Sequence, residues 1–195
     1  RIVDADISAD GRYVVTTEKG AILRFYDRES AGEKDIELKE EIRSVDISPD
    51  SDHAAVSGDT EMLLVSFKKD EVKSNKCMRD SGVRPVFSSD GKKLAAACGG
   101  TITIFSVPDF LVSGEIKIEG RTALFLKFLP DSTLLAGFDK GILSHIDTLD
   151  NSIMNFSGRF DATNKVAVSS DGVFAATVAA HNNVRIWNVR EHKLF

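Results

Sequence analysis

The chain alternates short apolar runs with polar turns, and no segment shows a sustained helical period. Runs such as Tyr13-Val14-Val15 and Leu94-Ala95-Ala96-Ala97 lie between turn residues such as Gly and Asp. Runs this short are typical of buried strands rather than helices. Other stretches alternate apolar and polar residues, most clearly Thr101-Ile102-Thr103-Ile104-Phe105. Such alternation predicts strands with one buried face.

One motif recurs along the whole chain at nearly constant spacing. Each copy is a short apolar stretch followed by a turn that carries an aspartate, as in Asp46-Ile47-Ser48-Pro49-Asp50. The anchor aspartates are separated by 40, 40, 41 and 40 residues; they are Asp10, Asp50, Asp90, Asp131 and Asp171. Independent turns would not keep this register, so the spacing indicates an internal repeat. The repeats span about 1–40, 41–80, 81–120, 121–161 and 162–195.

Each repeat has room for four antiparallel strands. After the buried run comes a second turn, such as Lys19-Gly20, whose residues take positive φ at little cost. An alternating third strand follows, and then a charged stretch such as Ile36-Glu37-Leu38-Lys39, which suits a solvent-facing edge. Four strands in about 40 residues are typical of a propeller blade. The sequence therefore predicts an all-β chain: a β-propeller of four-stranded antiparallel blades, forming one domain or part of one.

At this point the chain resembles the WD40-repeat family over essentially its whole length. Val184-Arg185-Ile186-Trp187-Asn188 resembles that family's third-strand ending, with Asn in place of the usual Asp. Leu23-Arg24-Phe25-Tyr26-Asp27 is similar, with Tyr in place of Trp. The resemblance implies a structural role for Trp187 and Tyr26 in packing between blades.

The chain also departs from that family. The Gly-His pair that precedes each WD40 repeat is absent, and with it most of the hydrogen-bonded set to which the histidine belongs. Only fragments of the set remain, namely Asp59 with Ser57, and Asp139. We therefore expect blades held mainly by apolar packing. Several other propeller families carry a similar Ser-x-Asp-Gly turn, so the choice among propeller families stays open.

The number of blades leaves two alternatives. Propellers have roughly four to eight blades, and the resemblance implies about seven. We expect the five repeats to be part of a larger ring, completed by residues outside this sequence or by a partner chain. A closed five-bladed ring is the alternative.

Composition and charge narrow the function. Hydrophobic residues make up 42% and charged residues 28%, the mix of a soluble globular protein. The net charge of −5 argues against a nucleic-acid binder, and no apolar run is long enough to span a membrane. Cys77 and Cys98 match no zinc or redox motif, and no signal peptide is visible. We expect two reduced thiols in an intracellular protein, cytoplasmic or nuclear.

The residue patterns of common enzymes are missing. The sequence contains no phosphate-binding Gly-rich Lys loop, dinucleotide fingerprint or Gly-x-Ser-x-Gly elbow. The histidines fall in different repeats without metal-ligand spacing, and we expect isolated strand or turn residues; they are His53, His145, His181 and His192. Each anchor aspartate is expected to cap its own turn rather than to bind calcium. These patterns predict no catalytic residue, no metal and no cofactor.

Candidate binding residues lie in the loops that lead into the innermost strands. These loops ring one mouth of a propeller channel, and each carries a basic residue: Arg43, Arg84, Arg121 and Lys165. A collar of these four would suit an acidic or phosphorylated peptide. Solvated loop charges without a shared role are the alternative.

The sequence thus predicts a non-catalytic interaction scaffold, which docks a protein or peptide on a propeller face within a multiprotein complex. The alternative is a propeller enzyme, such as a lactonase-like metal-dependent hydrolase. That enzyme would need carboxylates or histidines from several blades to converge on the channel axis, and the channel-facing loops show no ordered set of this kind.

Overall fold

All regular secondary structure in the described residues is β-strand. The computed structural model describes residues 1–69, 71–77, 84–98, 100–118, 120–156, 163–179 and 184–195. Within these ranges the strands form five four-stranded sheets, and consecutive strands pair antiparallel. Each sheet corresponds to one sequence repeat and is called a blade below.

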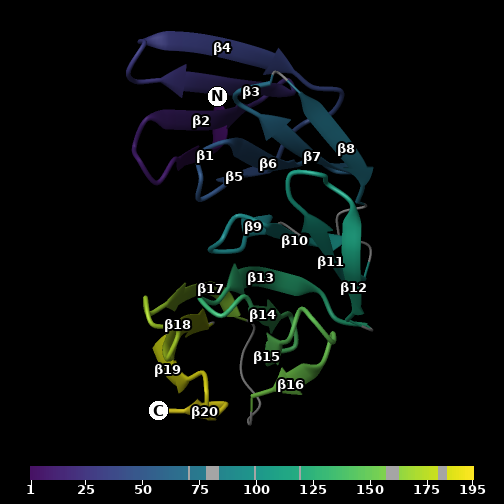
Figure 1. The fold of residues 1–195 in the computed structure, drawn as a ribbon. Helices are drawn as coiled ribbons and strands as arrows, with labels where there is room; N and C mark the ends of the chain where they lie inside the picture. The colour runs from purple at the N-terminus through teal and green to yellow at the C-terminus, as the bar shows by residue number, and fades with distance from the viewer. Residues whose placement is uncertain (70, 78–83, 99, 119, 157–162, 180–183) are drawn as a thin grey trace.

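Each blade runs from an innermost to an outermost strand in chain order (Figure 1). The first blade contains β1 (Ile2–Ile7), β2 (Tyr13–Glu18), β3 (Ile22–Asp27) and β4 (Gly32–Glu37), and the second contains β5 (Ser44–Ile47), β6 (His53–Ser57), β7 (Glu61–Ser66) and β8 (Val72–Lys76). The third contains β9 (Val86–Phe87), β10 (Lys93–Cys98), β11 (Thr101–Ser106) and β12 (Val112–Lys117). The fourth contains β13 (Ala123–Phe128), β14 (Leu134–Phe138), β15 (Leu143–Ile146) and β16 (Ile153–Asn155), and the fifth contains β17 (Thr163–Val168), β18 (Phe174–Ala179), β19 (Val184–Asn188) and β20 (Lys193–Leu194).

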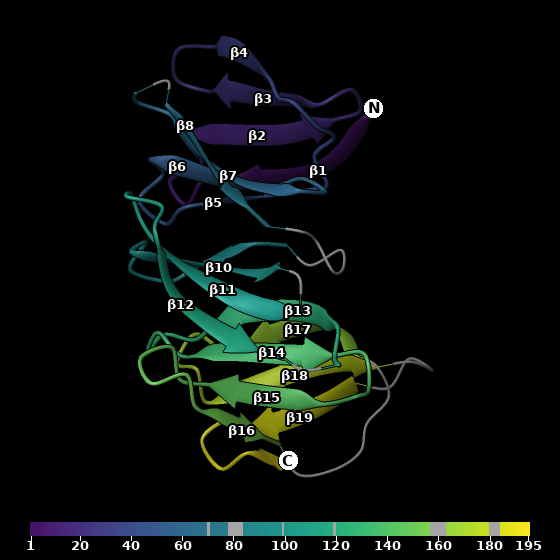
Figure 2. The ribbon, with the colours of Figure 1, turned by 90° about the vertical axis from the view of Figure 1, so that its right-hand side faces the viewer.

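The blades follow one another around an arc with their innermost strands on the inside (Figures 1 and 2). The innermost strands contact one another in sequence, β1 with β5, β5 with β9, β9 with β13 and β13 with β17. Among the described residues, no such packing joins β17 back to β1, and Figure 1 shows the arc open between the first and fifth blades. The predicted blades are confirmed, and their arrangement leaves two blades at open ends.

The turn between the first and second strands of each blade explains why an aspartate recurs in every repeat. Ser88 Oγ donates to Asp90 Oδ1 at 2.6 Å, and the same carboxylate oxygen accepts the Lys92 N–H at 3.1 Å. The Lys93 N–H donates to Ser88 Oγ at 2.9 Å. The same bonds recur around Asp10, Asp50 and Asp171, and Thr133 supplies the corresponding donors to Asp131. Bonds from Ser88 and Lys92 lower the pKa of Asp90, which keeps the turn intact at neutral pH.

Neighbouring blades pack face to face through apolar clusters. In the third strand of each blade, two consecutive residues near the end of the strand point to opposite faces of the blade. The second of the two packs on the preceding blade, as Val65, Phe105 and Trp187 do. The first packs on the following blade, as Phe25 and Leu64 do. A blade that lies between two others therefore buries both of its faces.

The prediction of two reduced thiols is wrong for this structure. Cys77, just after β8, and Cys98, the last residue of β10, form a disulfide with their Cα atoms 4.8 Å apart. The pair joins the second blade to the third inside their shared apolar cluster. Sequence reasoning missed it because the two residues lie 21 positions apart in different repeats. Disulfides are typical of oxidising compartments, so the intracellular location stays a prediction that this crosslink does not support.

We expect reduction of the disulfide to lower the free energy of unfolding by about 3 kcal/mol, because the crosslink closes a loop of 21 residues in the unfolded chain. Urea titration with and without reductant measures the loss. The Cys77→Ala/Cys98→Ala variant is the control and should not respond to reductant. Two free thiols titrating in freshly purified, denatured protein contradict the pairing.

Candidate protein-interaction surfaces

The end blades of the arc each leave one face without a neighbour. In the hairpin registers, Tyr26 of the first blade takes the position that Trp187 takes in the fifth. Tyr26 is 36% exposed, whereas Trp187 is 1% exposed. Ile186 of the fifth blade likewise takes the position of Phe25, and their exposed fractions are 46% and 9%. Positions that are buried at a junction between blades therefore meet solvent at the two ends.

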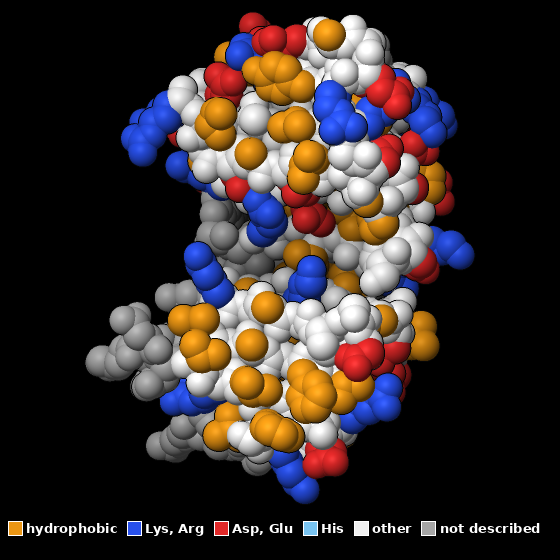
Figure 3. All heavy atoms as spheres, turned by 90° about the vertical axis from the view of Figure 1, so that its left-hand side faces the viewer, with side chains coloured by type: hydrophobic (Ala, Val, Ile, Leu, Met, Phe, Trp, Pro, Cys, Tyr) orange, Lys and Arg blue, Asp and Glu red, His pale blue; other side chains and the backbone are white. Residues whose placement is uncertain are grey.

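The free face of the fifth blade is strongly apolar. Its exposed hydrophobic side chains are Phe174, Val178, Val184, Ile186 and Phe195. The rings of Phe174 and Phe195 meet edge to face with centroids 5.7 Å apart. Figure 3, which faces the open side of the arc, shows hydrophobic side chains clustered over the lower blade. Such a patch is larger than the scattered apolar residues of an ordinary surface.

The free face of the first blade is mixed in character. Ile7, Val14 and Tyr26 pair across three strands and form an apolar row. In the next row, Arg24 is ion-paired with Asp35 at 2.7 Å. Both apolar and charged side chains are visible on the upper blade in Figure 3. This face could contact both apolar and polar parts of a partner.

Carboxylates on β1 and β5 link the first blade to the second and the second blade to the third along the channel. The Val45 N–H donates to Asp4 Oδ2 at 3.0 Å, and the Ile47 N–H donates to Asp6 Oδ2 at 2.7 Å. In the same way, the Phe87 N–H donates to Asp46 at 3.0 Å. An innermost strand has a sheet partner on one side only, so half of its N–H groups need another acceptor. At these two junctions an aspartate of the preceding blade supplies that acceptor, whereas the third and fourth blades carry Val86 and Lys127 at the matching position.

Asp46 lies in an unusual electrostatic environment for a carboxylate. Burial raises the pKa of its carboxyl to about 7, with Asp6 adding to the rise, while the Phe87 N–H, Arg84 and Lys127 oppose it. Asp46 and Lys127 line a cavity of about 360 Å³ at the channel mouth formed by the first turns of the blades. The cavity is also lined by Ser89, Ser169 and Ser170 and by apolar residues of four blades. Sequence reasoning missed these channel aspartates, although Asp6 and Asp46 stand at matching repeat positions.

The four predicted basic residues lie in different environments. Arg84 reaches across the channel to the first blade, where its Nε is 3.2 Å from Asp4 Oδ2. Arg43 pairs with Asp59 of its own blade at 3.2 Å. The remaining two are Arg121, stacked over Phe138 at 5.4 Å, and Lys165, exposed on β17. Residues 81–83 and 162 of the predicted loops lie outside the described residues. Their role in peptide binding stays a prediction.

Two of the four histidines are not isolated, which corrects the sequence expectation. His145 Nδ1 of the fourth blade lies 2.9 Å from His192 Nε2 of the fifth. His145 Nε2 also contacts the Thr133 hydroxyl at 2.6 Å. Burial and the neighbouring His192 lower the pKa of His145, and burial lowers the pKa of His192, so both shifts favour the neutral rings. His53 lies in another blade junction, and His181 lies outside the described residues.

Residues that the WD40 resemblance assigns to a hydrogen-bonded set have partners close by in the structure. The Trp187 indole N–H donates to Thr177 Oγ1 at 2.8 Å in a buried site, a link that the sequence reasoning missed. Ser57 contacts the Ser44 hydroxyl, and Asp139 accepts the Thr122 N–H at 3.1 Å. Each of these bonds lies within one blade.

Two further features are absent from the described part of the chain. It contains no helix long and apolar enough to cross a membrane. Nor does this part place three or more His, Cys, Asp or Glu side chains together as a metal site.

Comparison with known proteins identifies the architecture. The sequence matches no protein-family model and no curated protein. Among solved structures, the β-propeller domain of Cps50 (Swd1) from Myceliophteria thermophila is similar over 100% of this chain and 72% of that chain, with a TM-score of 0.77. The fold is a β-propeller. At 16% identity the likeness shows the fold alone, and membership of the WD40 family stays a prediction.

Asp46 predicts a pH dependence of stability. Its ordinary pKa is 3.8 and its folded pKa is about 7, so between these values the folded state holds a proton that the unfolded state has released. The free energy of unfolding should therefore fall as pH rises through this window. Asp46→Asn keeps an oxygen to accept the Phe87 N–H and removes the titration.

Urea titrations of the wild type and of Asp46→Asn from pH 4 to pH 8 measure the difference. We expect the wild type to lose more than about 1 kcal/mol relative to the variant over this range. Parallel pH profiles of the two proteins would show that Asp46 ionises normally.

Proposed function

We propose that this chain is a non-catalytic scaffold whose two end faces are covered by further protein. The strongest support comes from Ile186, because its counterpart Phe25 is buried at a blade junction. Contiguous exposed apolar surface of this kind typically marks a protein-binding site. A rigid arc of five sheets can hold partners in fixed positions without any chemistry of its own.

The occupant that best fits these faces is additional β-blades from protein outside these 195 residues. The end faces carry apolar side chains at the positions that pack one blade on another. A closed five-bladed ring fits less well. Among the described residues, β17 does not pack on β1 as the other neighbouring innermost strands pack on each other, and Tyr26 and Ile186 stay exposed at the two ends. The WD40 resemblance, with about seven blades, agrees with this proposal.

The proposal predicts that Ile186→Asp disrupts assembly while Leu149→Asp does not. Both residues are exposed in this chain, but Leu149 lies in a turn at the outer rim. Tagged full-length protein is purified from its native cells and examined by native mass spectrometry and thermal unfolding. Burying a new aspartate at a blade junction should remove a partner or destabilise the ring.

Three outcomes are distinguishable. A stoichiometric partner lost only in Ile186→Asp indicates blades supplied by another chain. A lowered midpoint of thermal unfolding for the full-length Ile186→Asp protein alone indicates blades in the same polypeptide. If the Ile186→Asp and Leu149→Asp proteins behave alike in both measurements, the proposal is wrong.

The predicted acidic-peptide site is tested in the same purification. A variant in which four residues are changed to glutamate reverses the predicted collar; the residues are Arg43, Arg84, Arg121 and Lys165. A partner lost in this variant but kept in Ile186→Asp places docking at the channel mouth. A partner kept in the collar variant excludes the collar as its docking site.

A further inference from the structure

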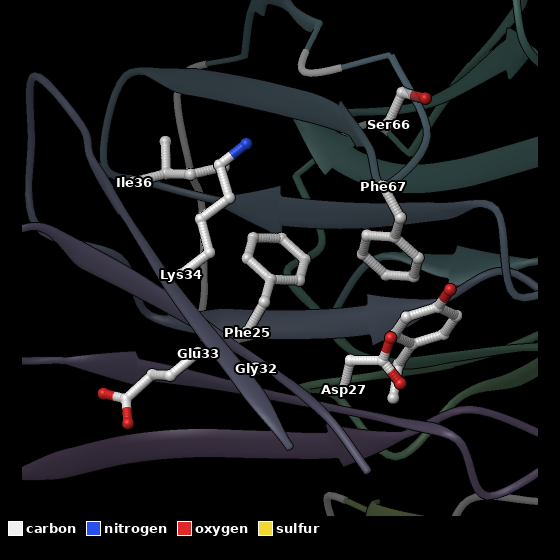
Figure 4. A pocket seen from close by; sticks show the side chains of 9 residues that line it. Phe25, Asp27, Gly32, Glu33, Lys34, Ile36, Ser66 and Phe67 are labelled. Atoms are coloured by element: carbon white, nitrogen blue, oxygen red, sulfur yellow. The ribbon is translucent and has the colours of Figure 1, made fainter. Parts of the chain in front are cut away.

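An apolar cavity opens at the outer rim between the first and second blades (Figure 4). It has a volume of about 250 Å³. The rings of Phe25 and Phe67 form its floor with centroids 4.9 Å apart, and Tyr13 lies 5.1 Å from Phe67. Lys34 and Ile36 of β4 form one wall, as Figure 4 shows. The cavity therefore presents aromatic surface to solvent.

A second cavity continues the first along β4. It has a volume of about 270 Å³ and shares Ile36 with the first. Its apolar walls come from Leu38 of the first blade and from Leu63 and Val72 of the second. We call the two cavities together the rim groove. A segment lying along β4 could place alternate side chains in both.

The next blade junction shows what fills such a groove. Between the second and third blades, the chain's own Phe110 is buried against Phe105, with ring centroids 4.9 Å apart. The Phe110 carbonyl accepts a hydrogen bond from Asn75 at 2.7 Å, and the Pro108 carbonyl accepts one from Lys73 at 2.9 Å. At this junction the remaining cavity is only about 110 Å³. An aromatic residue on an irregular segment, with its carbonyls held by the outermost strand, thus completes a blade junction.

At the rim groove the segment after β7 supplies Phe67, which packs on Phe25 and forms part of the floor of the first cavity. The position that corresponds to Phe110 is residue 70, which lies outside the described residues. In the strand registers Lys34 pairs with Phe25 as Lys73 pairs with Leu64, so Lys34 takes the position of Lys73. Lys34 thus lines the first cavity at the position where Lys73 binds the Pro108 carbonyl in the next junction. An aromatic side chain would then enter the cavity floored by Phe25 and Phe67.

The charged residues around the rim groove indicate which residues would fit beside the aromatic side chain of a bound segment. Two lysines and five carboxylates line it: Lys34 and Lys39, and Asp27, Glu33, Glu37, Glu40 and Glu61. Arg12 holds the pKa of Asp27 far below its ordinary value, and Glu40 accepts the Thr60 and Glu61 N–H groups. Glu37 is exposed on β4. The net negative rim favours a segment with Lys or Arg beside its aromatic residue.

We propose that the rim groove binds an irregular or extended segment of a partner protein, which inserts an aromatic side chain and carries basic residues beside it. This site is separate from the two end faces and from the predicted basic collar. It adds a peptide-binding site on the rim to the proposed scaffold, and it does not depend on how the ring closes.

Selection of a randomised peptide library on the full-length protein tests the proposal. We expect the selected peptides to share an aromatic residue with neighbouring Lys or Arg. Gly32 alternates with Lys34 and Ile36 on the groove side of β4, so Gly32→Trp should place an indole in the first cavity. This variant should weaken the selected peptides at least about tenfold in fluorescence-anisotropy titrations.

Matched variants separate the groove from general effects. Lys117→Trp puts the same side chain on the exposed outermost strand of the third blade and should leave binding unchanged. Glu61→Lys should weaken binding about threefold at low salt, whereas Glu115→Lys on the third blade should not. Circular dichroism confirms that each variant is folded.

Several results would overturn the proposal. These are a selection that yields no peptide, peptides that are acidic or lack an aromatic residue, and peptides that bind Gly32→Trp as well as the wild type. The Ile186→Asp variant distinguishes peptide binding at the rim groove from binding at the end faces. Peptide binding that survives in Ile186→Asp supports the groove even if the end faces bind nothing, and binding lost in Ile186→Asp assigns the peptides to the end face instead.

Discussion

A four-stranded blade has two faces, and this structure depends on covering both of them. Each inner junction buries a cluster of apolar side chains, and burial of one large aliphatic or aromatic side chain is worth about 1.5–3 kcal/mol. No single blade can gain this stabilisation alone, so the chain is stable only as a succession of blades. The same requirement makes the end faces important, because Tyr26 and Ile186 stand at positions that are buried elsewhere.

A second constraint acts along the channel, where each innermost strand has one free edge. Aspartates on β1 and β5 accept the N–H groups of the following blade, and Arg84 returns from the third blade to Asp4 of the first. These contacts set the positions of neighbouring innermost strands, while apolar packing sets the spacing of the sheets. The charged side chains of β1, β5 and Arg84 that face the channel therefore already bind other groups of the same chain. Candidate binding surfaces therefore lie at the end faces and at the rim groove as well as at the channel mouth.

The blades could be predicted from sequence because the signals that define them are local. The Ser–Asp turn is built from residues within five positions of one another, so the turn can be recognised from a short stretch of sequence. Contacts between repeats left no such signal. The Cys77–Cys98 disulfide and the His145–His192 contact both join residues of different blades, and sequence reasoning treated each residue as isolated. The rim groove was invisible for the same reason, since Phe25 and Phe67 meet only when two blades pack.

Hydroxyl-radical footprinting tests most directly whether the end faces are covered in the working protein. The isolated 195-residue chain and the protein purified from its native cells are oxidised in parallel, and the modification of each residue is measured by mass spectrometry. We expect Ile186, Phe174 and Tyr26 to be modified in the isolated chain and protected in the protein from cells, with Trp187 protected in both. Equal modification of Ile186, Phe174 and Tyr26 in the two preparations would contradict the proposal that further protein covers these faces.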